Sequence, residues 1–412
     1  MQIIVSHPTG NANVKAALQG MVNQNALSAF YTSVAIFPGT LGYALSNIKP
    51  LGDIRKRTLN PNLRPFTHTK PLPELCRLLA MKAGLRQLIE HEKGVFSVDA
   101  IYRGLDKKVT ADLHKWHKKK NVALYAYEDG ACFSFREAKK QGITCLYDLP
   151  IGYWRVARDI LEAEKERWPD WASTIMGLRD SPEKLQRKDD EIKLADHVFV
   201  ASQFTATTLQ KYAGRVGPVH IVPYGYPDVI GKRDYATGAT AKLKLLFVGG
   251  LSQRKGIADM FAAVANIKNH VSLTVVGRKS TENCKPLNDA LNECNWIPSL
   301  PHTEILKLMR SHDVLLFPSL FEGFGLVITE AMSQGTPVIT TERTAGPDLI
   351  EHGRNGWLVK AGSTEGLQEM IEQLLLKRED VKNNGTAAME SARIRPWSVY
   401  GSELQNKINS IL

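Results

Sequence analysis

Short apolar runs rich in β-branched residues alternate with helical patterns along almost the whole chain, and few folds accommodate that alternation. It is typical of α/β proteins, in which helices cover both faces of parallel sheets. We expect strands near residues 3–6, 30–36, 123–127, 144–147, 198–201 and 220–222 in the first half, and near 245–248, 273–276, 314–317, 337–341 and 356–359 in the second. The pattern therefore predicts a doubly wound parallel sheet in each half.

The chain is long enough for two or three domains, with 412 residues. Residues 223–242 are rich in proline, glycine and small polar residues and show no clear period, and a strand pattern restarts directly after them. We therefore expect a first domain over residues 1–225 and a second over 240–390. The helical pattern that follows Pro396 predicts that residues 391–412 end in a helix, which packs back on the first domain.

Positive charge is concentrated in one stretch of the chain. The net charge is +11, and between Lys49 and Lys120 there are 17 Lys and Arg residues against 7 Asp and Glu, a local excess of +10. Such a stretch favours phosphate-bearing partners, namely nucleic acid, an anionic membrane or an anionic substrate, although it also serves solubility alone. Leu75–Ile89 within it predicts an amphipathic helix that either packs on the core or lies on a membrane. Because the stretch has few aromatic residues for base stacking, we expect no nucleic-acid partner.

The remaining composition points to a reducing compartment. No run of about 20 apolar residues is present, so we expect no membrane-spanning helix. The N-terminal MQIIVSHPTGN lacks a basic region and reads as a first strand, not as a signal peptide. Five scattered cysteines without a CxxC pair argue against a disulfide framework and a zinc site. We expect a cytoplasmic protein, peripheral on the inner face of the membrane if the basic stretch binds lipid.

Residues 314–341 carry the most chemical information. A buried-type strand leads into a loop over 318–325 that contains glycines, then into a short helix over 326–334 and the next strand. Ligands of open parallel sheets bind at such strand-to-helix loops, and the free N–H groups at a helix start favour an anion. Glu322 in the loop and Glu330 on the helix are therefore candidate site residues. Taken singly, each also fits an ordinary solvated acid.

The text PSLFEGFGLVITEAMSQGTPVI resembles the Glu-x7-Glu motif of the retaining family-4 glycosyltransferases. LLFVGGLSQRKGI resembles the diphosphate-binding loop at the start of their second domain, and GPDLIEHGRNGWLV resembles a later helix and strand. The resemblance covers residues 243–376 well and the first half more loosely. It implies the α/β fold named GT-B, with two Rossmann-like doubly wound domains facing a central cleft and a C-terminal helix crossing back to the first domain.

The resemblance also implies roles for residues of the second domain. Glu322 would hold hydroxyls of the donor sugar, Glu330 the ribose and Lys255 the diphosphate. The backbone groups implied in donor binding are those of Gly249, Gly250, Phe324, Gly325 and Leu326. Because the family often has an arginine where this chain has Gly250, we expect Arg254 to supply the missing charge. The family implies neither a bound metal nor a cofactor.

The first domain offers a second set of candidates. Gly10 and Asn11 match the family's glycine loop, which faces the donor diphosphate, although a plain tight turn is the alternative. Many relatives carry a histidine near the position of Asp148, so we expect Asp148 to orient a hydroxyl, with a structural turn role as the alternative. Glu128 and Asp129 are expected to lie where their strand opens on the cleft between the domains, and capping of the following helix is the alternative for Asp129. Residues 189–191 read as a solvated helix face.

These observations predict a metal-independent, retaining hexosyltransferase in which Glu322, Lys255, Arg254 and Asp148 serve catalysis. It would move a hexose-type sugar from a nucleotide diphosphate sugar to an acceptor, one that a lipid-linked chain would fit, in bacterial surface polysaccharide or glycolipid assembly. One alternative is a glycosidase or phosphorylase with paired carboxylates. Another is a basic membrane- or nucleic-acid-binding module without transferase activity.

Overall fold

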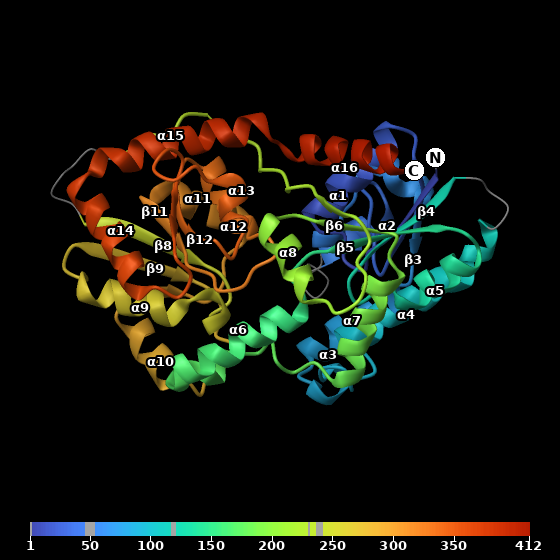
Figure 1. The fold of residues 1–412 in the computed structure, drawn as a ribbon, viewed down its shortest axis with the longest axis horizontal. Helices are drawn as coiled ribbons and strands as arrows, with labels where there is room; N and C mark the ends of the chain where they lie inside the picture. The colour runs from blue at the N-terminus through green and yellow to red at the C-terminus, as the bar shows by residue number, and fades with distance from the viewer. Residues whose placement is uncertain (1, 46–53, 117–120, 230, 236–241) are drawn as a thin grey trace.

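Two parallel sheets form the framework of the molecule and lie side by side in Figure 1. The computed structural model describes residues 2–45, 54–116, 121–229, 231–235 and 242–412. The strands of the first sheet, in spatial order, are β3 (Thr67–Thr69), β2 (Leu27–Thr32), β1 (Gln2–Ser6), β4 (Val122–Tyr127), β5 (Thr144–Leu149), β6 (His197–Val200) and β7 (Val219–Ile221). Those of the second are β10 (Asn295–Ile297), β9 (Val271–Val276), β8 (Leu243–Val248), β11 (Val314–Phe317), β12 (Val338–Thr341) and β13 (Trp357–Val359).

Helices cover the faces of both sheets. Those that precede the second sheet in the chain are α1 (Ala12–Asn23), α2 (Leu41–Leu45), α3 (Pro71–Lys82), α4 (Val98–Asp112), α5 (Cys132–Lys140), α6 (Trp154–Arg167), α7 (Pro182–Leu194) and α8 (Gln203–Thr208). The later ones are α9 (Ile257–Asn266), α10 (Lys285–Asn292), α11 (His302–Ser311), α12 (Leu326–Ser333), α13 (Gly346–Leu349), α14 (Thr364–Leu376), α15 (Arg378–Ile394) and α16 (Trp397–Ile411). Short 3-10 turns are η2 (Pro61–Phe66), η3 (Arg86–Ile89), η4 (Leu113–Lys115), η5 (Pro169–Thr174), η6 (Leu209–Lys211) and η7 (Gln253–Lys255).

Each sheet has an apolar core on both faces, as continuous apolar strands require. Every residue of β11 is buried, for example. The predicted parallel α/β architecture is thus confirmed. The pattern missed β3 and β10, which are three-residue strands at the edges of their sheets. Among the described residues, no helix has the length and apolarity needed to cross a membrane.

The C-terminal helix α16 returns to the first domain and packs against α1, as predicted (Figure 1). The two helices touch at glycines, because a Cβ on Gly20 would lie 2.2 Å from the carbonyl oxygen of Gly401. Tyr400, Leu404 and Ile408 on α16 are buried in the first-domain core. The last segment of the chain therefore fastens the first domain to the second.

A second crossing runs the other way through α6 and η5. Trp171 on η5 is packed in the core of the second sheet. Arg167 at the end of α6 pairs with Asp259 on α9 at 2.6 Å. A segment that precedes the second sheet by about 70 residues in the printed sequence thus belongs to its packing.

Candidate functional site

An acid and two cations meet where neighbouring strands β8 and β11 end. The carboxylate of Glu322, in the loop between β11 and α12, contacts Nζ of Lys255 and lies 3.2 Å from Nη1 of Arg254. Arg254 also donates to the carbonyl oxygen of Phe321 at 2.7 Å. Both cations lie on η7, which follows β8. The structure thus brings together the three residues that the sequence placed in one site.

Burial and charge act against each other in this cluster. Burial lowers the pKa of Lys255 below its ordinary value, although Glu322 opposes the shift. Burial also acts to raise the pKa of Glu322, but the charges and hydrogen bonds of Lys255 and Arg254 outweigh it, so that the net pKa lies below the ordinary value. Glu322 is therefore ionised at neutral pH. The ammonium group of Lys255 lies 4.7 Å from the ring centre of Phe317, which adds a cation–π contact.

The start of α12 offers free backbone donors beside this cluster. No hydrogen bond in the described ranges uses the N–H of Phe324, Gly325 or Leu326 as its donor. Gly325 has φ = 90°, and a Cβ there would lie 2.6 Å from the Phe317 ring. Only glycine fits that turn, which leads directly into the first turn of α12, where the N–H groups have no partner within the helix. Free N–H groups and the helix dipole at this point attract an anion.

The same loop is docked on the first domain. The carbonyl oxygen of Gly323 accepts hydrogen bonds from the hydroxyls of Ser202 at 2.6 Å and Thr205 at 3.0 Å. The side chain of Phe324 is buried in the first-domain core, with its ring centre 4.9 Å from that of Tyr224. Ser202 and Thr205 were not among the predicted site residues, although serine at a helix start is a recognisable capping signal.

Glu330 lies on the solvent side of α12, with its side chain 18% exposed. It pairs with His302 at the start of α11, at 3.0 Å. The hydrogen bond to Glu330 raises the pKa of His302 above its ordinary value. Glu330 is thus accessible, and its neighbour His302 was not among the residues predicted from the sequence.

The loop after β1 is shaped by a buried histidine. Nδ1 of His7 accepts hydrogen bonds from the backbone N–H of Thr9 at 3.1 Å and of Gly10 at 3.0 Å. Burial, with the charge of Arg57, lowers the pKa of His7 to about 3, so the ring stays neutral as this acceptor role requires. Gly10 has φ = 61°, a left-handed conformation that suits glycine. Asn11 is exposed at the start of α1.

Arg57 connects the loop that follows β1 to helix α3. It donates to the carbonyl oxygen of Thr9 at 2.7 Å and pairs with Glu74 on α3 at 3.1 Å.

In the second domain, Gly249 sits so close to Gly277 that a Cβ on Gly277 would lie 1.8 Å from the Gly249 carbonyl oxygen. A Cβ on Gly250 would meet no atom within 4 Å. Gly250 therefore borders open space at the end of β8.

Asp148 is buried on β5 with 4% exposure. Its carboxylate accepts a hydrogen bond from the Tyr125 hydroxyl at 2.6 Å. Burial raises the pKa of Asp148 to about 7, although the hydrogen bond from Tyr125 opposes the shift. This position inside the first-domain core favours the structural role over contact with a ligand hydroxyl.

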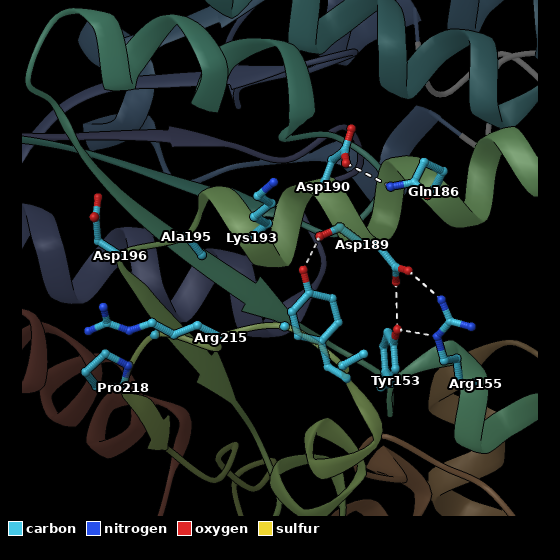
Figure 2. Close-up of a pocket in the computed structure, with 14 residues that line it drawn as sticks. Tyr153, Arg155, Gln186, Asp189, Asp190, Lys193, Ala195, Asp196, Arg215 and Pro218 are labelled. Atoms are coloured by element: carbon cyan, nitrogen blue, oxygen red, sulfur yellow. Dashed lines mark hydrogen bonds and ion pairs between the residues drawn. The ribbon is translucent and has the colours of Figure 1, made fainter.

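The expectation of a solvated face over residues 189–191 is wrong. Glu191 is fully buried, and its carboxylate accepts hydrogen bonds from the backbone N–H of Asp129, Ala131 and Cys132 within 3.1 Å. Burial raises the pKa of Glu191 to about 8. Asp189 is also buried, and Figure 2 shows it facing Tyr153 and Arg155 at the edge of a pocket of about 650 Å³. None of the predicted site residues lines that pocket.

Glu128 and Asp129 lie at the end of β4 as predicted, but lysines of α7 surround them. Lys188 lies 3.4 Å from Glu128 and 3.7 Å from Asp129. Burial raises the pKa of Glu128. Lys188 also lines a cavity of about 200 Å³ between the domains, together with Gly152, Arg254 and Phe321. This cavity adjoins the Glu322 cluster from the first-domain side.

One group of three potential metal ligands occurs among the described residues, namely His91, Glu92 and Asp180. Its carboxylates already have partners in the chain. Asp180 pairs with Lys184 at 2.9 Å, and Glu92 accepts the backbone N–H of Ser181 at 2.9 Å. Asp180 also lines the cavity beside Arg254 and Lys188, whereas none of the three residues contacts Glu322.

Comparisons with known proteins agree with this picture. Residues 236–390 match the family described as glycosyl transferases group 1. A D-inositol 3-phosphate glycosyltransferase from Segniliparus rotundus is 31% identical over 248 residues, which are 55% of each chain. An N-acetyl-alpha-D-glucosaminyl L-malate synthase from Bacillus anthracis is 32% identical over 165 residues, 39% of this chain and 43% of that protein. The matched regions thus span about half the length of these relatives.

Solved structures resemble the whole chain. Anabaena HepE in complex with UDP has a TM-score of 0.64 and 16% identity, and each chain is covered completely. The lipopolysaccharide outer core galactosyltransferase WaaB, in its apo form, has a TM-score of 0.63 and 15% identity, again with complete coverage of both chains. These likenesses and the two-sheet topology confirm the GT-B fold.

Proposed function

Residues 236–390 belong to the glycosyl transferases group 1 family, and on this premise we propose that the chain transfers a sugar from a nucleotide diphosphate sugar to an acceptor. The observation that carries the proposal is the cluster of Glu322, Lys255 and Arg254 beside the free N–H groups that begin α12. Cations and unpaired backbone donors at one point suit a diphosphate whose negative charge grows as the sugar leaves.

The donor would lie along the carboxyl ends of β8 and β11. Its diphosphate meets Lys255, Arg254 and the backbone of residues 324–326. The ionised Glu322 accepts hydrogen bonds from sugar hydroxyls. Glu330, at the accessible side of α12, accepts the ribose hydroxyls in place of its present partner His302. The loop of Gly10 in the first domain faces the diphosphate from the opposite side of the cleft.

A bound diphosphate also changes the partners of the cations. Glu322 now shares its carboxylate with Lys255 and Arg254. A diphosphate competes for both cations and frees carboxylate oxygens for the sugar. The transfer proceeds with retention, and a departing phosphate oxygen takes the acceptor proton, so that no protein base is required. The acceptor enters from the first-domain side, where the cavity beside Arg254 and Lys188 opens.

Uracil is the first base to test in the donor, because HepE has been solved with UDP-glucose and with UDP. Capsular polysaccharide assembly is the setting named for one relative, CapM from Staphylococcus aureus, which is 28% identical over 179 residues. A surface polysaccharide or glycolipid is accordingly the acceptor class that we propose.

Saturation-transfer NMR with a panel of nucleotide sugars tests the proposal. We expect signals from the ribose, the base and one sugar, and slow release of that sugar without acceptor. A chain that binds no nucleotide sugar would not be a transferase. Rapid sugar release from simple glycosides, without a nucleotide, would indicate a glycosidase instead.

A further inference from the structure

We propose that a pocket on the first domain binds a sugar that carries a phosphate or carboxylate group, a function separate from the proposed transfer reaction. This α7 pocket, drawn in Figure 2, has a volume of about 650 Å³, which suits a small molecule. One face of α7 contributes, over about 10 Å of the helix, Gln186, Asp189, Asp190 and Lys193. The segment that leads into β7 adds Arg215.

Asp189 is occupied by partners from the start of α6. One of its carboxylate oxygens accepts hydrogen bonds from the Tyr153 hydroxyl at 2.8 Å and from Nε1 of Trp154 at 2.7 Å. The other accepts from Arg155 at 2.9 Å (Figure 2). Tyr153 is itself only 1% exposed. This carboxylate therefore belongs to the packing of α6 on α7 and is not free to bind a ligand.

The other two acids of the α7 pocket are paired as well. Asp190 forms an ion pair with Arg136 at 2.5 Å. Asp196 contacts Nζ of Lys139 and accepts the backbone N–H of Cys145 at 2.8 Å. Each carboxylate of the pocket thus has a cation of the chain beside it, and the acids leave no net negative charge to repel an anionic ligand.

Two cations of the pocket have no such partner. Lys193 and Arg215 are exposed, and neither side chain forms a hydrogen bond or an ion pair within the part of the chain that the structure describes (Figure 2). No hydrogen bond there uses the backbone N–H of residues 214–217 as its donor either. The pocket therefore offers free donors and two uncompensated positive charges, and a ligand with anionic oxygens satisfies both.

Neutral polar groups beside these cations favour a sugar as the body of the ligand. The side-chain oxygen of Gln186 has no hydrogen-bond partner among the described residues. The Tyr212 hydroxyl donates to the carbonyl oxygen of Asp189 at 3.2 Å and keeps its lone pairs for another donor. Free acceptors of this kind suit hydroxyl groups, which a bare phosphate ion does not supply in number. A sugar with an anionic substituent matches both the cations and the acceptors.

The α7 pocket and the cavity beside Arg254 lie on two sides of the same elements. On α7, Lys188 lines that cavity and Asp189 lines the pocket, and at the start of α6 the same holds for Trp154 and Tyr153. The hydrogen bond from Trp154 to Asp189 joins the two walls. The anionic sugar is either one unit of an acidic glycan or a free sugar phosphate, and the experiment distinguishes these sources.

Saturation-transfer NMR on the full chain tests the inference with trigalacturonate, glucose 6-phosphate and the neutral maltotriose as probes. We expect signals from at least one anionic probe, unchanged by saturating UDP and weakened by high salt, and none from maltotriose. Binding of trigalacturonate alone would assign the pocket to an acidic glycan, and binding of glucose 6-phosphate alone to a free sugar phosphate. Because no sugar donor is present, the result does not depend on transfer activity.

A charge variant places the probe in the α7 pocket. Lys193→Gln, Arg215→Gln should raise the Kd of the bound probe roughly tenfold or more, because both charge-assisted contacts are lost. The matched control, Lys285→Gln, Lys307→Gln, makes the same change in charge at exposed positions of the second domain and should bind as the parent does.

The thermal unfolding midpoint confirms that both double variants fold, as the exposure of all four side chains leads us to expect. Four results would each overturn the inference: no binding of either anionic probe, equal binding of maltotriose, displacement of the probe by UDP, or the same loss in both double variants. Competition by inorganic phosphate as strong as that by the sugar probe would overturn it too, because it would show a general anion contact only.

Discussion

The hydroxyl of Ser202 donates a hydrogen bond to the carbonyl oxygen of Gly323 at 2.6 Å, and this bond joins the two domains beside Glu322. Thr205 adds a second hydroxyl on the same oxygen at 3.0 Å. Gly323 is also pressed against the first domain, because a Cβ there would lie 1.9 Å from the carbonyl oxygen of Pro150. The position of the Glu322 loop therefore depends on the first domain.

Loss of one of these hydroxyls should weaken donor use. Thr205→Val removes a hydroxyl at nearly constant shape, and Ser202 would keep both the other bond to Gly323 and its capping bond to Thr205 N. A neutral hydrogen bond contributes about 1 kcal/mol, so we expect kcat/KM for the donor to fall about fivefold. The control is Thr207→Val on the same helix, whose exposed hydroxyl bonds only to Gln203 within α8. Equal effects in both variants would show that the inter-domain bond has no role in donor binding.

Lys255→Ala should weaken binding of a nucleoside diphosphate and slow transfer. The variant removes a charge-assisted contact of about 1.5–3 kcal/mol, which corresponds to roughly a ten- to hundredfold rise in Kd. Titration calorimetry with UDP measures the change, and Lys285→Ala, at a strongly exposed position, is the control. An unchanged Kd and rate in a folded Lys255→Ala protein would remove Lys255 from the site.

The two glutamates should differ in which ligand they recognise. Glu330→Ala should weaken binding of free UDP and of the whole donor alike, because the ribose belongs to both. Glu322→Ala should reduce turnover and donor affinity but leave free UDP within about twofold, because sugar hydroxyls are absent from it. Calorimetry with UDP and with the sugar donor distinguishes the variants. The same pattern in both would contradict the assigned roles.

The local sequence was enough to predict β11 and α12, the strand and the helix that carry the second-domain site. β11 occupies the expected residues 314–317, and α12 ends one residue before the expected end. β11 is a continuous apolar run, VLLF, and α12 lies between Gly325 and Gly335. β3 and β10 were missed, whereas the equally short edge strands β7 and β13 were predicted; the three residues of β3, THT, include no apolar side chain. Their pairing depends on neighbours distant in sequence.

The burial of Glu191 and the role of Ser202 could not be predicted from their surroundings in the chain. Glu191 sits among Asp189, Asp190 and two lysines, which reads as a polar helix face. Its partners are backbone N–H groups about 60 residues earlier. Ser202 meets Gly323 across 121 residues and two domains. Such contacts depend on how the sheets and helices assemble, and a single sequence carries no signal for that distance.

Asp148→Asn should retain transfer and change how stability depends on pH. In the folded chain, burial raises the pKa of Asp148 to about 7, above its ordinary value of 3.8. The folded state therefore keeps a proton that the unfolded chain loses, and the contribution of Asp148 to the free energy of unfolding falls as pH rises from about 4 to about 7. Asparagine cannot ionise, and its oxygen can still accept from the hydroxyl of Tyr125.

The stability of Asp148→Asn relative to the parent should accordingly increase between pH 4 and pH 7 and level off above it. Urea unfolding across this range measures the difference in the free energy of unfolding between Asp148→Asn and the parent. Glu128 and Glu191 are present in both proteins, so their titration cancels in this difference. Asp148→Ala should be less stable at every pH, because it leaves a cavity and an unpaired Tyr125 hydroxyl in the core. A pH-independent difference between Asp148→Asn and the parent would show that Asp148 ionises normally in the fold. Complete loss of transfer in a folded Asp148→Asn protein that still binds donor would instead make its negative charge essential to the reaction.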